Sequence, residues 1–310
     1  MKKALVAGWF SFDQMGASAG DLMACDLACA WLRRAGRAYD VALAPPFEGG
    51  VSWEKADPRE YSPVIFVCGP FGNGWPVTDF LKHFSGCGMI GLNLSMLDPL
   101  DHWNPFDRLW ERDSSVTSRP DMAFLSEQPR VPVVGLVLID TQPEYRDKDA
   151  HEEANEALRR LARVHGAAPV NIDTRLDFNT TGLRSAAQVE SLIARMDLVL
   201  TTRLHGMVLA IKNGVPALAV DSVVGGGKIR RQAEAIGWPY VFSVEGATDQ
   251  ALQHAFRDCM TADVRATAKD CADRARAEIE RMSAEFIREL CLGPDRSTPD
   301  QPGQSTVAGR

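Results

Sequence analysis

The sequence lacks the features that mark several large classes of protein. No hydrophobic run approaches the roughly 20 residues that span a bilayer. The start, Met-Lys-Lys-Ala-Leu-Val-Ala-Gly, turns polar too soon for a secretory signal. The formal net charge is −7 and no cluster of Lys and Arg stands out, which disfavours nucleic-acid binding. We therefore expect a cytoplasmic protein with no transmembrane segment and no nucleic-acid partner.

Metal-ligand spacing is also missing, and the first glycine-bearing loop does not have the spacing of a known nucleotide-binding motif. The seven cysteines are an odd number and none has zinc-ligand spacing, so free, mostly buried thiols are expected. The spacing in the glycine-bearing loop at residues 9–21 matches neither the dinucleotide fingerprint nor the Walker pattern, and no repeat of short period is visible along the chain. We see no cluster of metal ligands and expect no metal.

What the sequence does contain is two similar α/β halves. Its 310 residues, 45% hydrophobic and 24% charged, suit two domains of about 150 residues each. In both halves, short buried strands alternate with amphipathic helices. A polar, proline-bearing stretch at 125–130 predicts the linker, which gives domains at 1–125 and 126–292. Residues 262–290 predict a long helix that packs along the domains, and the polar tail at 293–310 predicts disorder.

Residues 197–221 form the most informative stretch. It reads as a buried strand, a turn that presents Arg203 and His205, a short apolar helix closed by Gly214, and a second buried strand. The end of a parallel strand where a helix begins is a natural anion site, because helix N–H groups and the helix dipole point there. Lys228 follows three glycines and begins the next helix. Two cations and a histidine on one rim would repel each other unless an anion lies among them.

Plainer interpretations of these side chains stay open. Lys228 could be a solvated loop lysine, and His205 a buried histidine that caps its helix. In the N-terminal half, Asp21 ends a glycine-bearing loop before a helix expected at 22–34, and it suits either a ligand loop or a helix N-cap. His102 and Trp103 could line a sugar site or simply anchor a loop.

Several short motifs resemble one family. Residues 201–206, Thr-Thr-Arg-Leu-His-Gly, together with Gly-Val-Pro at 214–216 and the later Lys228, resemble the signature of the polysaccharide pyruvyl transferases. Gly20-Asp21 resembles that family's early Gly-Asp element. Residues 110–115 resemble its Arg-Asp-x-x-Ser element, and residues 120–124 its Asp-x-Ala-Phe element. The resemblance implies a GT-B-like α/β fold, with two Rossmann-type domains facing across a cleft.

The resemblance also implies a reaction and a set of site residues. Members of the family transfer pyruvate from phosphoenolpyruvate to two hydroxyls of a sugar as a cyclic ketal, in exopolysaccharide biosynthesis. Phosphoenolpyruvate is then a co-substrate, and neither a cofactor nor a metal is required. The implied partners are this small anionic donor and a saccharide acceptor, with a lipid-linked acceptor left open. The implied roles are catalysis for His205 and Asp21, donor binding for Arg203, Gly206 and Lys228, and acceptor binding for Gly72, Asn73, His102 and Trp103.

Two departures and two rival functions remain. The segment between Ser115 and Asp121 is short, and the turn at 69–72 lacks the triple glycine often seen in the family. Both lie in the half expected to bind the acceptor, so the identity of the acceptor and the oligomeric state stay open. A GT-B glycosyltransferase that uses a nucleotide sugar would need a ribose-binding carboxylate, for which Asp221 is the obvious candidate. A non-catalytic ligand-binding relative would have lost the acid/base residue.

Overall fold

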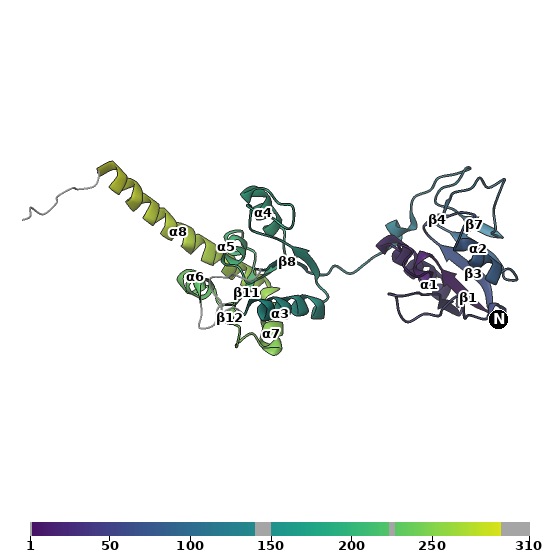
Figure 1. Cartoon of the computed structure of the whole chain (residues 1–310), viewed down its shortest axis with the longest axis horizontal. Helices are drawn as coiled ribbons and strands as arrows, with labels where there is room; N and C mark the ends of the chain where they lie inside the picture. Colours follow the sequence, from purple (N-terminus) through teal and green to yellow (C-terminus); the bar gives the residue numbers. More distant parts are fainter. Residues whose placement is uncertain (1, 140–149, 223–226, 293–310) are drawn as a thin grey trace, which may run out of the picture. The chain divides into compact units, whose positions relative to one another are not determined.

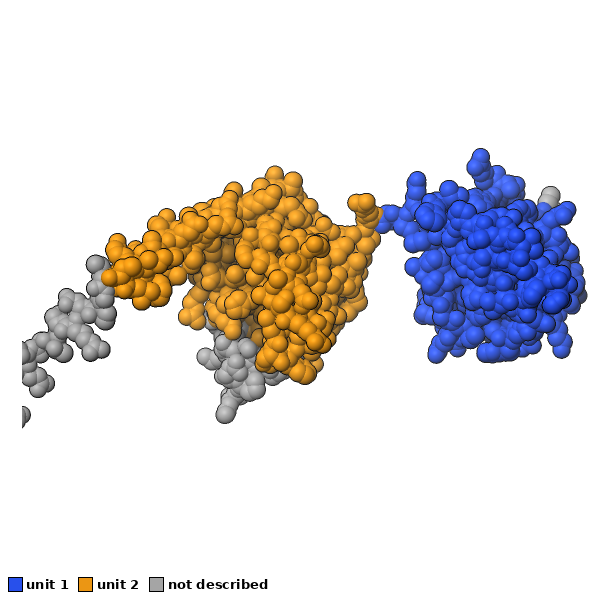
Figure 2. All heavy atoms as spheres, turned by 90° about the horizontal axis from the view of Figure 1, so that it is seen from above, with its two compact units in different colours: residues 1–129 blue, residues 130–310 orange. Residues whose placement is uncertain are grey.

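Two five-stranded parallel sheets, each with its own helices, organise the chain in a computed structural model that describes residues 2–139, 150–222 and 227–292. The chain divides into unit 1, Met1–Pro129, and unit 2, Arg130–Arg310 (Figures 1 and 2). The division lies within the stretch predicted as a linker. The predicted disorder at 293–310 concerns a segment outside the described residues.

Unit 1 is built on a sheet with the strand order β2-β1-β3-β5-β7. Its strands are β1 (Lys3–Ala7), β2 (Tyr39–Val41), β3 (Tyr61–Val67), β5 (Met89–Leu92) and β7 (Arg108–Trp110). Two short strands, β4 (Pro70–Phe71) and β6 (Ser95–Met96), form a separate parallel pair. The helices are α1 (Ala19–Arg34) and α2 (Val77–His83), with 3-10 turns η1 (Trp9–Ser11), η2 (Pro58–Glu60) and η3 (Met122–Leu125).

Unit 2 has a sheet with the order β12-β11-β10-β8-β9. Its strands are β8 (Val133–Val137), β9 (Ala168–Asn171), β10 (Leu198–Thr201), β11 (Ala217–Asp221) and β12 (Val241–Ser243). The helices are α3 (His151–Val164), α4 (Ala186–Ile193), α5 (Leu204–Lys212), α6 (Lys228–Ile236), α7 (Asp249–Cys259) and α8 (Ala262–Leu292).

Both sheets follow the same topology. When the strands of each sheet are numbered along the chain, both read 2-1-3-4-5, one of the two common orders of doubly wound α/β sheets. The strand order reverses between β1 and β3 in unit 1 and between β8 and β10 in unit 2, and ligands of such sheets bind outside the carboxyl ends of strands at this reversal. The predicted α/β class is thus confirmed. That the two domains face across a cleft stays a prediction.

The continuous apolar strands of unit 2 are explained by helices on both faces of its sheet. All residues of β10 and β11 are buried. Alternate side chains of these strands pack into two separate clusters, one with residues of α5, α6 and α8 and the other with residues of α3 and α7. In α3, the stripe Ala154, Ala157, Leu158 and Leu161 is buried, as its spacing predicts. A strand buried on both faces needs no polar alternation.

Helix α8 is the long C-terminal helix that the sequence predicts (Figure 1). Its first half packs on unit 2, where Ala268 and Cys271 are fully buried. Farther along, the apolar side chains of Ile279, Met282 and Phe286 are more than half exposed. The sequence predicts packing along the whole helix. Within unit 2, the first half of α8 packs in this way, and the three apolar side chains of the second half are exposed. Among the described residues no helix is long and apolar enough to cross a membrane.

We predict that His165 makes the stability of unit 2 depend on pH. Its ring stacks on Phe256 of α7, with centroids 4.0 Å apart, and its Nε2 is buried without a hydrogen-bond partner among the described residues. Burial, followed by the charge of Arg257, lowers the pKa of His165. The unfolded chain therefore takes up a proton at higher pH than the folded chain, and the free energy of unfolding falls as the pH drops below about 6.5.

Chemical denaturation at several pH values, on the wild type and on His165→Phe, tests this prediction. Phenylalanine keeps the stacked ring but cannot titrate, so the wild type should lose stability relative to the variant on acidification. Parallel stability curves between pH 7.5 and pH 5.5 would contradict it.

Candidate functional site

The turn after β10 brings Arg203 to the point where the strand order of unit 2 reverses. Arg203 is the N-cap of α5 in an extended conformation, and its side chain is 12% exposed. Its Nε donates a hydrogen bond of 2.9 Å to the carbonyl of Leu138, just beyond β8. The guanidinium thus lies across the carboxyl ends of β8 and β10, the part of the sheet where ligands of this fold bind.

Two buried threonines, which the sequence analysis did not single out, fix this turn. The Thr201 hydroxyl donates to the carbonyl of Val137 and accepts from the N–H of Arg203. The Thr202 hydroxyl accepts from the N–H of Ile139 and donates to Asn155 of α3, which in turn donates to the carbonyl of Ile139. Since these bonds satisfy the backbone at the end of both strands, the turn has little freedom to move Arg203. A Thr-Thr pair at the end of a buried strand was the only sequence signal for this role.

The first turn of α5 offers backbone N–H groups at the same strand ends as the guanidinium. Leu204, His205 and Gly206 have no acceptor for their N–H groups among the described residues, as is usual in a first helical turn. Gly206 itself is buried, and a Cβ there would lie 2.2 Å from Thr201 Oγ1 and 2.8 Å from Val137 Cγ1. The absence of a side chain therefore lets α5 start close against the strand ends. Gly206 can contribute its N–H group to a ligand, and its packing gives the residue a structural role as well.

Asp173 provides Arg203 with a partial counter-charge. Its Oδ1 lies 3.7 Å from Nη2 of Arg203, and its side chain is 10% exposed. Burial opposes ionisation of Asp173, but hydrogen bonds from the N–H groups of Arg175 and Thr180 and the charge of Arg203 lower its pKa overall. Charge repulsion on this rim is therefore smaller than the sequence alone indicated. An outside anion is not needed to offset all of it.

His205 and Lys228 both have exposed side chains. The interpretation of His205 as a buried histidine is therefore wrong. Lys228 begins α6 and makes no ion pair within the part of the chain that the structure describes, and the preceding residues 223–226 lie outside that part. Asp221 is 2% exposed and accepts hydrogen bonds from the N–H groups of Gly227 and Arg230. This carboxylate caps α6 and so has a structural role. A glycosyltransferase that uses a nucleotide sugar would need it to bind the ribose instead.

In unit 1, Asp21 takes the helix-entry role. Its Oδ2 accepts from the N–H and the hydroxyl of Ser18, and its own N–H bonds back to the Ser18 hydroxyl. This capping box starts α1 at Ala19, earlier than the predicted residue 22. Asp21 is 6% exposed and points toward the end of β3, since a Cβ on Gly69 would lie 3.3 Å from its Oδ1. Burial, then the Asp21 charge, raises the pKa of Cys68 there to about 11.

A second polar cluster, not assigned from the sequence, gathers beyond the ends of β5 and β7 and at the start of β6. Arg112 donates to Asp121 at 2.8 Å and to Asp113 at 3.1 Å, and it also hydrogen-bonds to Ser95. Asn93 donates to the same oxygen of Asp121 at 3.1 Å. Two of the motifs that carry the family resemblance, at 110–115 and 120–124, thus meet through an ion pair between Arg112 and Asp121.

Within the described residues, none of the four residues predicted to bind the acceptor makes a hydrogen bond or ion pair with these clusters. Trp103 stacks on Phe71, with centroids 5.6 Å apart and an interplanar angle of 19°, and is partly buried on the core of unit 1. His102 is exposed beside Asp101. Asn73 is exposed, and its N–H donates to Asp98. Gly72 lies against Leu97 and Asp98. The loop-anchoring interpretation of Trp103 fits this packing, and binding of an acceptor by the four stays a prediction.

Comparison with known families adds one match. Residues 107–222 match the model of the family described as polysaccharide pyruvyl transferase. The predicted resemblance to this family is confirmed. The segment shared with the polysaccharide pyruvyl transferases contains Arg112, Asp121, Arg203, His205 and Gly206, whereas Asp21 and Lys228 lie outside it. A comparison with curated proteins finds no match to the sequence.

Several solved structures show a distant similarity. Spinosyn rhamnosyltransferase SpnG complexed with thymidine diphosphate is 11% identical, with a TM-score of 0.34 over 89% of this chain and 96% of that chain. Spinosyn forosaminyltransferase SpnP is 13% identical, with a TM-score of 0.36 over 93% and 100%. UDP-GlcNAc 2-epimerase from Methanocaldococcus jannaschii is 10% identical, with a TM-score of 0.32 over 90% and 100%. Similarity at this level carries no inference about function.

We predict that Gly206→Ala destabilises unit 2. In an ordinary helix the change would stabilise by up to about 1 kcal/mol. Here the added methyl group meets Thr201 and Val137, so the expected result is a loss of about 1–3 kcal/mol in the free energy of unfolding. Gly20→Ala is the control, because Gly20 also lies in a first helical turn but its Cβ would be 3.5 Å from Ser18 Oγ, an ordinary contact. Calorimetry that finds Gly206→Ala as stable as this control would contradict the prediction.

Proposed function

We propose that this protein transfers a pyruvyl group from phosphoenolpyruvate to a saccharide, forming a cyclic ketal. One observation carries the proposal: at the strand reversal of unit 2, the Arg203 guanidinium and the first turn of α5 lie at the same strand ends, and the N–H groups of that turn have no acceptor among the described residues. This arrangement belongs to the segment that matches the polysaccharide pyruvyl transferases. The proposal assigns the donor to unit 2 and the acceptor to unit 1.

The chemistry of the donor fits these groups. Phosphoenolpyruvate carries a phosphate and a carboxylate, and both are bound best by charge-assisted hydrogen bonds from Arg, Lys and helix N–H groups. In the proposed site, Arg203 and the N–H groups of His205 and Gly206 hold one anionic group. Lys228, at the start of α6 after the neighbouring strand β11, contributes to the other. The charge of Arg203 is only partly offset by Asp173 at 3.7 Å, which leaves it able to bind an anion.

The reaction needs two proton transfers. Two sugar hydroxyl oxygens form bonds to C2 of phosphoenolpyruvate, and the bond from C2 to the phosphate oxygen breaks. One hydroxyl proton is balanced by a proton gained at C3, which becomes a methyl group, and the other by protonation of the departing phosphate. An imidazole that titrates near neutral pH suits this work. His205 is the proposed acid/base residue, because its side chain is exposed at the start of α5, next to the proposed anion site.

We expect phosphoenolpyruvate to bind the wild type and to bind Arg203→Ala about ten- to a hundredfold more weakly, the effect of losing a hydrogen bond to a charged group. Isothermal titration calorimetry measures the affinity, and UDP- and GDP-sugars are titrated in parallel. Arg203→Lys keeps the positive charge but not the fork of donors, and should recover only part of the affinity. The control is Arg184→Ala, an exposed arginine elsewhere in unit 2.

Circular dichroism on each variant separates loss of binding from loss of fold. Binding of a nucleotide sugar without any binding of phosphoenolpyruvate would overturn the proposed function in favour of a glycosyltransferase.

His205→Gln should separate chemistry from binding. We expect its affinity for phosphoenolpyruvate to stay close to that of the wild type. The rate of phosphate release in the presence of saccharides should fall by about a hundredfold or more, the usual contribution of general acid/base catalysis. His254→Gln, an exposed histidine in α7, is the control. A His205→Gln enzyme with unchanged phosphate release would exclude His205 as the acid/base residue.

A further inference from the structure

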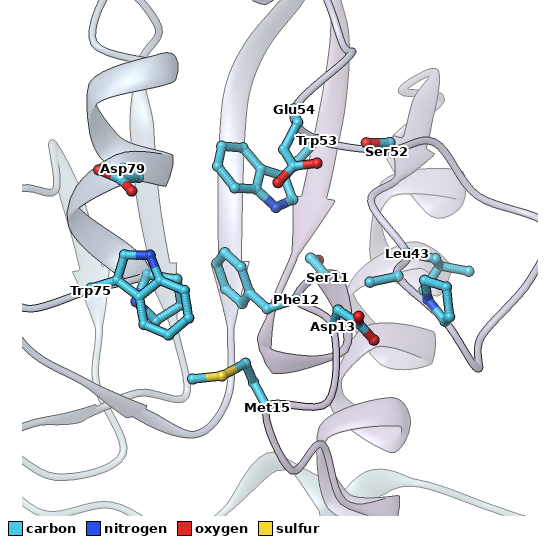
Figure 3. Close-up of a pocket in the computed structure, with 13 residues that line it drawn as sticks. Ser11, Phe12, Asp13, Met15, Leu43, Ser52, Trp53, Glu54, Trp75 and Asp79 are labelled. Carbon is cyan, nitrogen blue, oxygen red and sulfur yellow. The ribbon is translucent and has the colours of Figure 1, made fainter.

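Unit 1 contains a cavity of about 570 Å³ that the sequence analysis did not find (Figure 3). Its walls come from the segments that follow β1, β2 and β4, around Phe12, Leu43 and Trp75, together with the segment around Trp53. The cavity therefore lies at the carboxyl end of the sheet, the end where doubly wound folds bind their ligands. Its volume falls within the range of small-molecule sites, about 300–1,000 Å³. None of the four residues predicted to bind the acceptor lines it.

Two tryptophans line the cavity, and one is packed against other rings whereas the other is exposed. Trp53 is held in place by edge contacts with Phe12, Phe80 and His83, at centroid distances of 5.8, 5.6 and 5.7 Å. Trp75 makes no ring contact among the described residues and is 72% exposed, which is unusual for so large an apolar side chain. Figure 3 places Trp75 on one side of the cavity and Phe12 and Trp53 in the middle. A flat exposed indole is suited to stack on the apolar face of a sugar ring.

The charges around the cavity all have one sign. Asp13, Glu54 and Asp79 line it, and none of the three makes a hydrogen bond or an ion pair within the described part of the chain. No lysine or arginine is among its lining residues. In Figure 3, Asp79 lies on the side of Trp75, and Asp13 lies on the opposite side. Three carboxylates can accept hydrogen bonds from hydroxyl or amino groups, and they repel phosphates and carboxylates.

We propose that this cavity binds the acceptor as a saccharide ring that carries no phosphate or carboxylate. That the bound saccharide is the acceptor of the reaction rests on the proposed function. The class of ligand, a saccharide without an acidic group, follows from the side chains that line the cavity. Trp75 stacks on the ring, Trp53 forms the rigid floor, and the carboxylates of Asp13, Glu54 and Asp79 accept from hydroxyl or amino groups. The same negative charge excludes phosphoenolpyruvate, so donor and acceptor bind to surfaces of opposite charge.

The test measures saccharide binding to the full-length protein by saturation-transfer NMR and by tryptophan fluorescence, without phosphoenolpyruvate. The probes are methyl glucoside, methyl galactoside, methyl mannoside and glucosamine, compared with glucuronate and glucose 6-phosphate. We expect at least one probe of the first group to bind, and both acidic probes to bind about tenfold more weakly or not at all. Trp75→Ala should weaken binding of that probe by about tenfold. Trp31→Ala, an exposed tryptophan of α1 outside the cavity, should leave it unchanged.

A second variant tests the role of charge. Asp13→Asn, Glu54→Gln and Asp79→Asn together remove the three charges and keep the side-chain shapes, and because all three side chains are exposed the fold should persist. In this variant the acidic probes should bind as well as their neutral counterparts. The proposal is overturned if no neutral or amino probe binds, if Trp75→Ala binds like the wild type, or if the acidic probes bind best. The affinity for phosphoenolpyruvate, measured on the same variants, should equal that of the wild type. If the wild type does not bind phosphoenolpyruvate at all, the proposed function is overturned, whereas the saccharide result still decides the proposal for the cavity.

Discussion

The close contact of α5 with the ends of β8 and β10 is the constraint on which the proposed donor site depends. Residue 206 has no side chain, so the first turn of the helix lies against Thr201 and Val137. The same threonine holds the N–H of Arg203, and the guanidinium then reaches the carbonyl of Leu138. A cation and a set of backbone donors are brought together by packing and buried hydrogen bonds. Because this order exists before any ligand binds, little entropy is lost when an anion enters.

The two units share a topology but present opposite chemistry at the carboxyl ends of their sheets. Unit 2 presents Arg203 and helix N–H groups, and unit 1 presents a cavity with two tryptophans and three carboxylates. One sheet architecture thus supports two kinds of recognition, because the loops rather than the strands supply the side chains. Arg112, which follows β7 in unit 1, forms ion pairs with Asp113 and Asp121, so its charge is used within the fold.

Much of the fold could be predicted from the sequence, and less of the site. The buried strands and the stripe of α3 follow from local periodicity, and the turn with Arg203 and His205 from a motif within one short segment. Residues that become neighbours only through folding leave no such local pattern. Asp173 lies 3.7 Å from Arg203 but 30 positions away along the chain. The cavity of unit 1 is likewise formed by separate loops. Trp103, which looked like a sugar platform, stacks on Phe71, whereas the exposed Trp75 could not be distinguished from a core tryptophan by its sequence.

The central claim is that an anionic donor binds at the first turn of α5, and the backbone amides of that turn report on it directly. Titration of phosphoenolpyruvate into the isotopically labelled full-length protein, followed by amide NMR, should shift the signals of His205 and Gly206 saturably. At the same concentrations the shifts should be weaker in Arg203→Lys and weakest in Arg203→Ala. Saturable shifts confined to other parts of the chain, with His205 and Gly206 unmoved, would contradict the account.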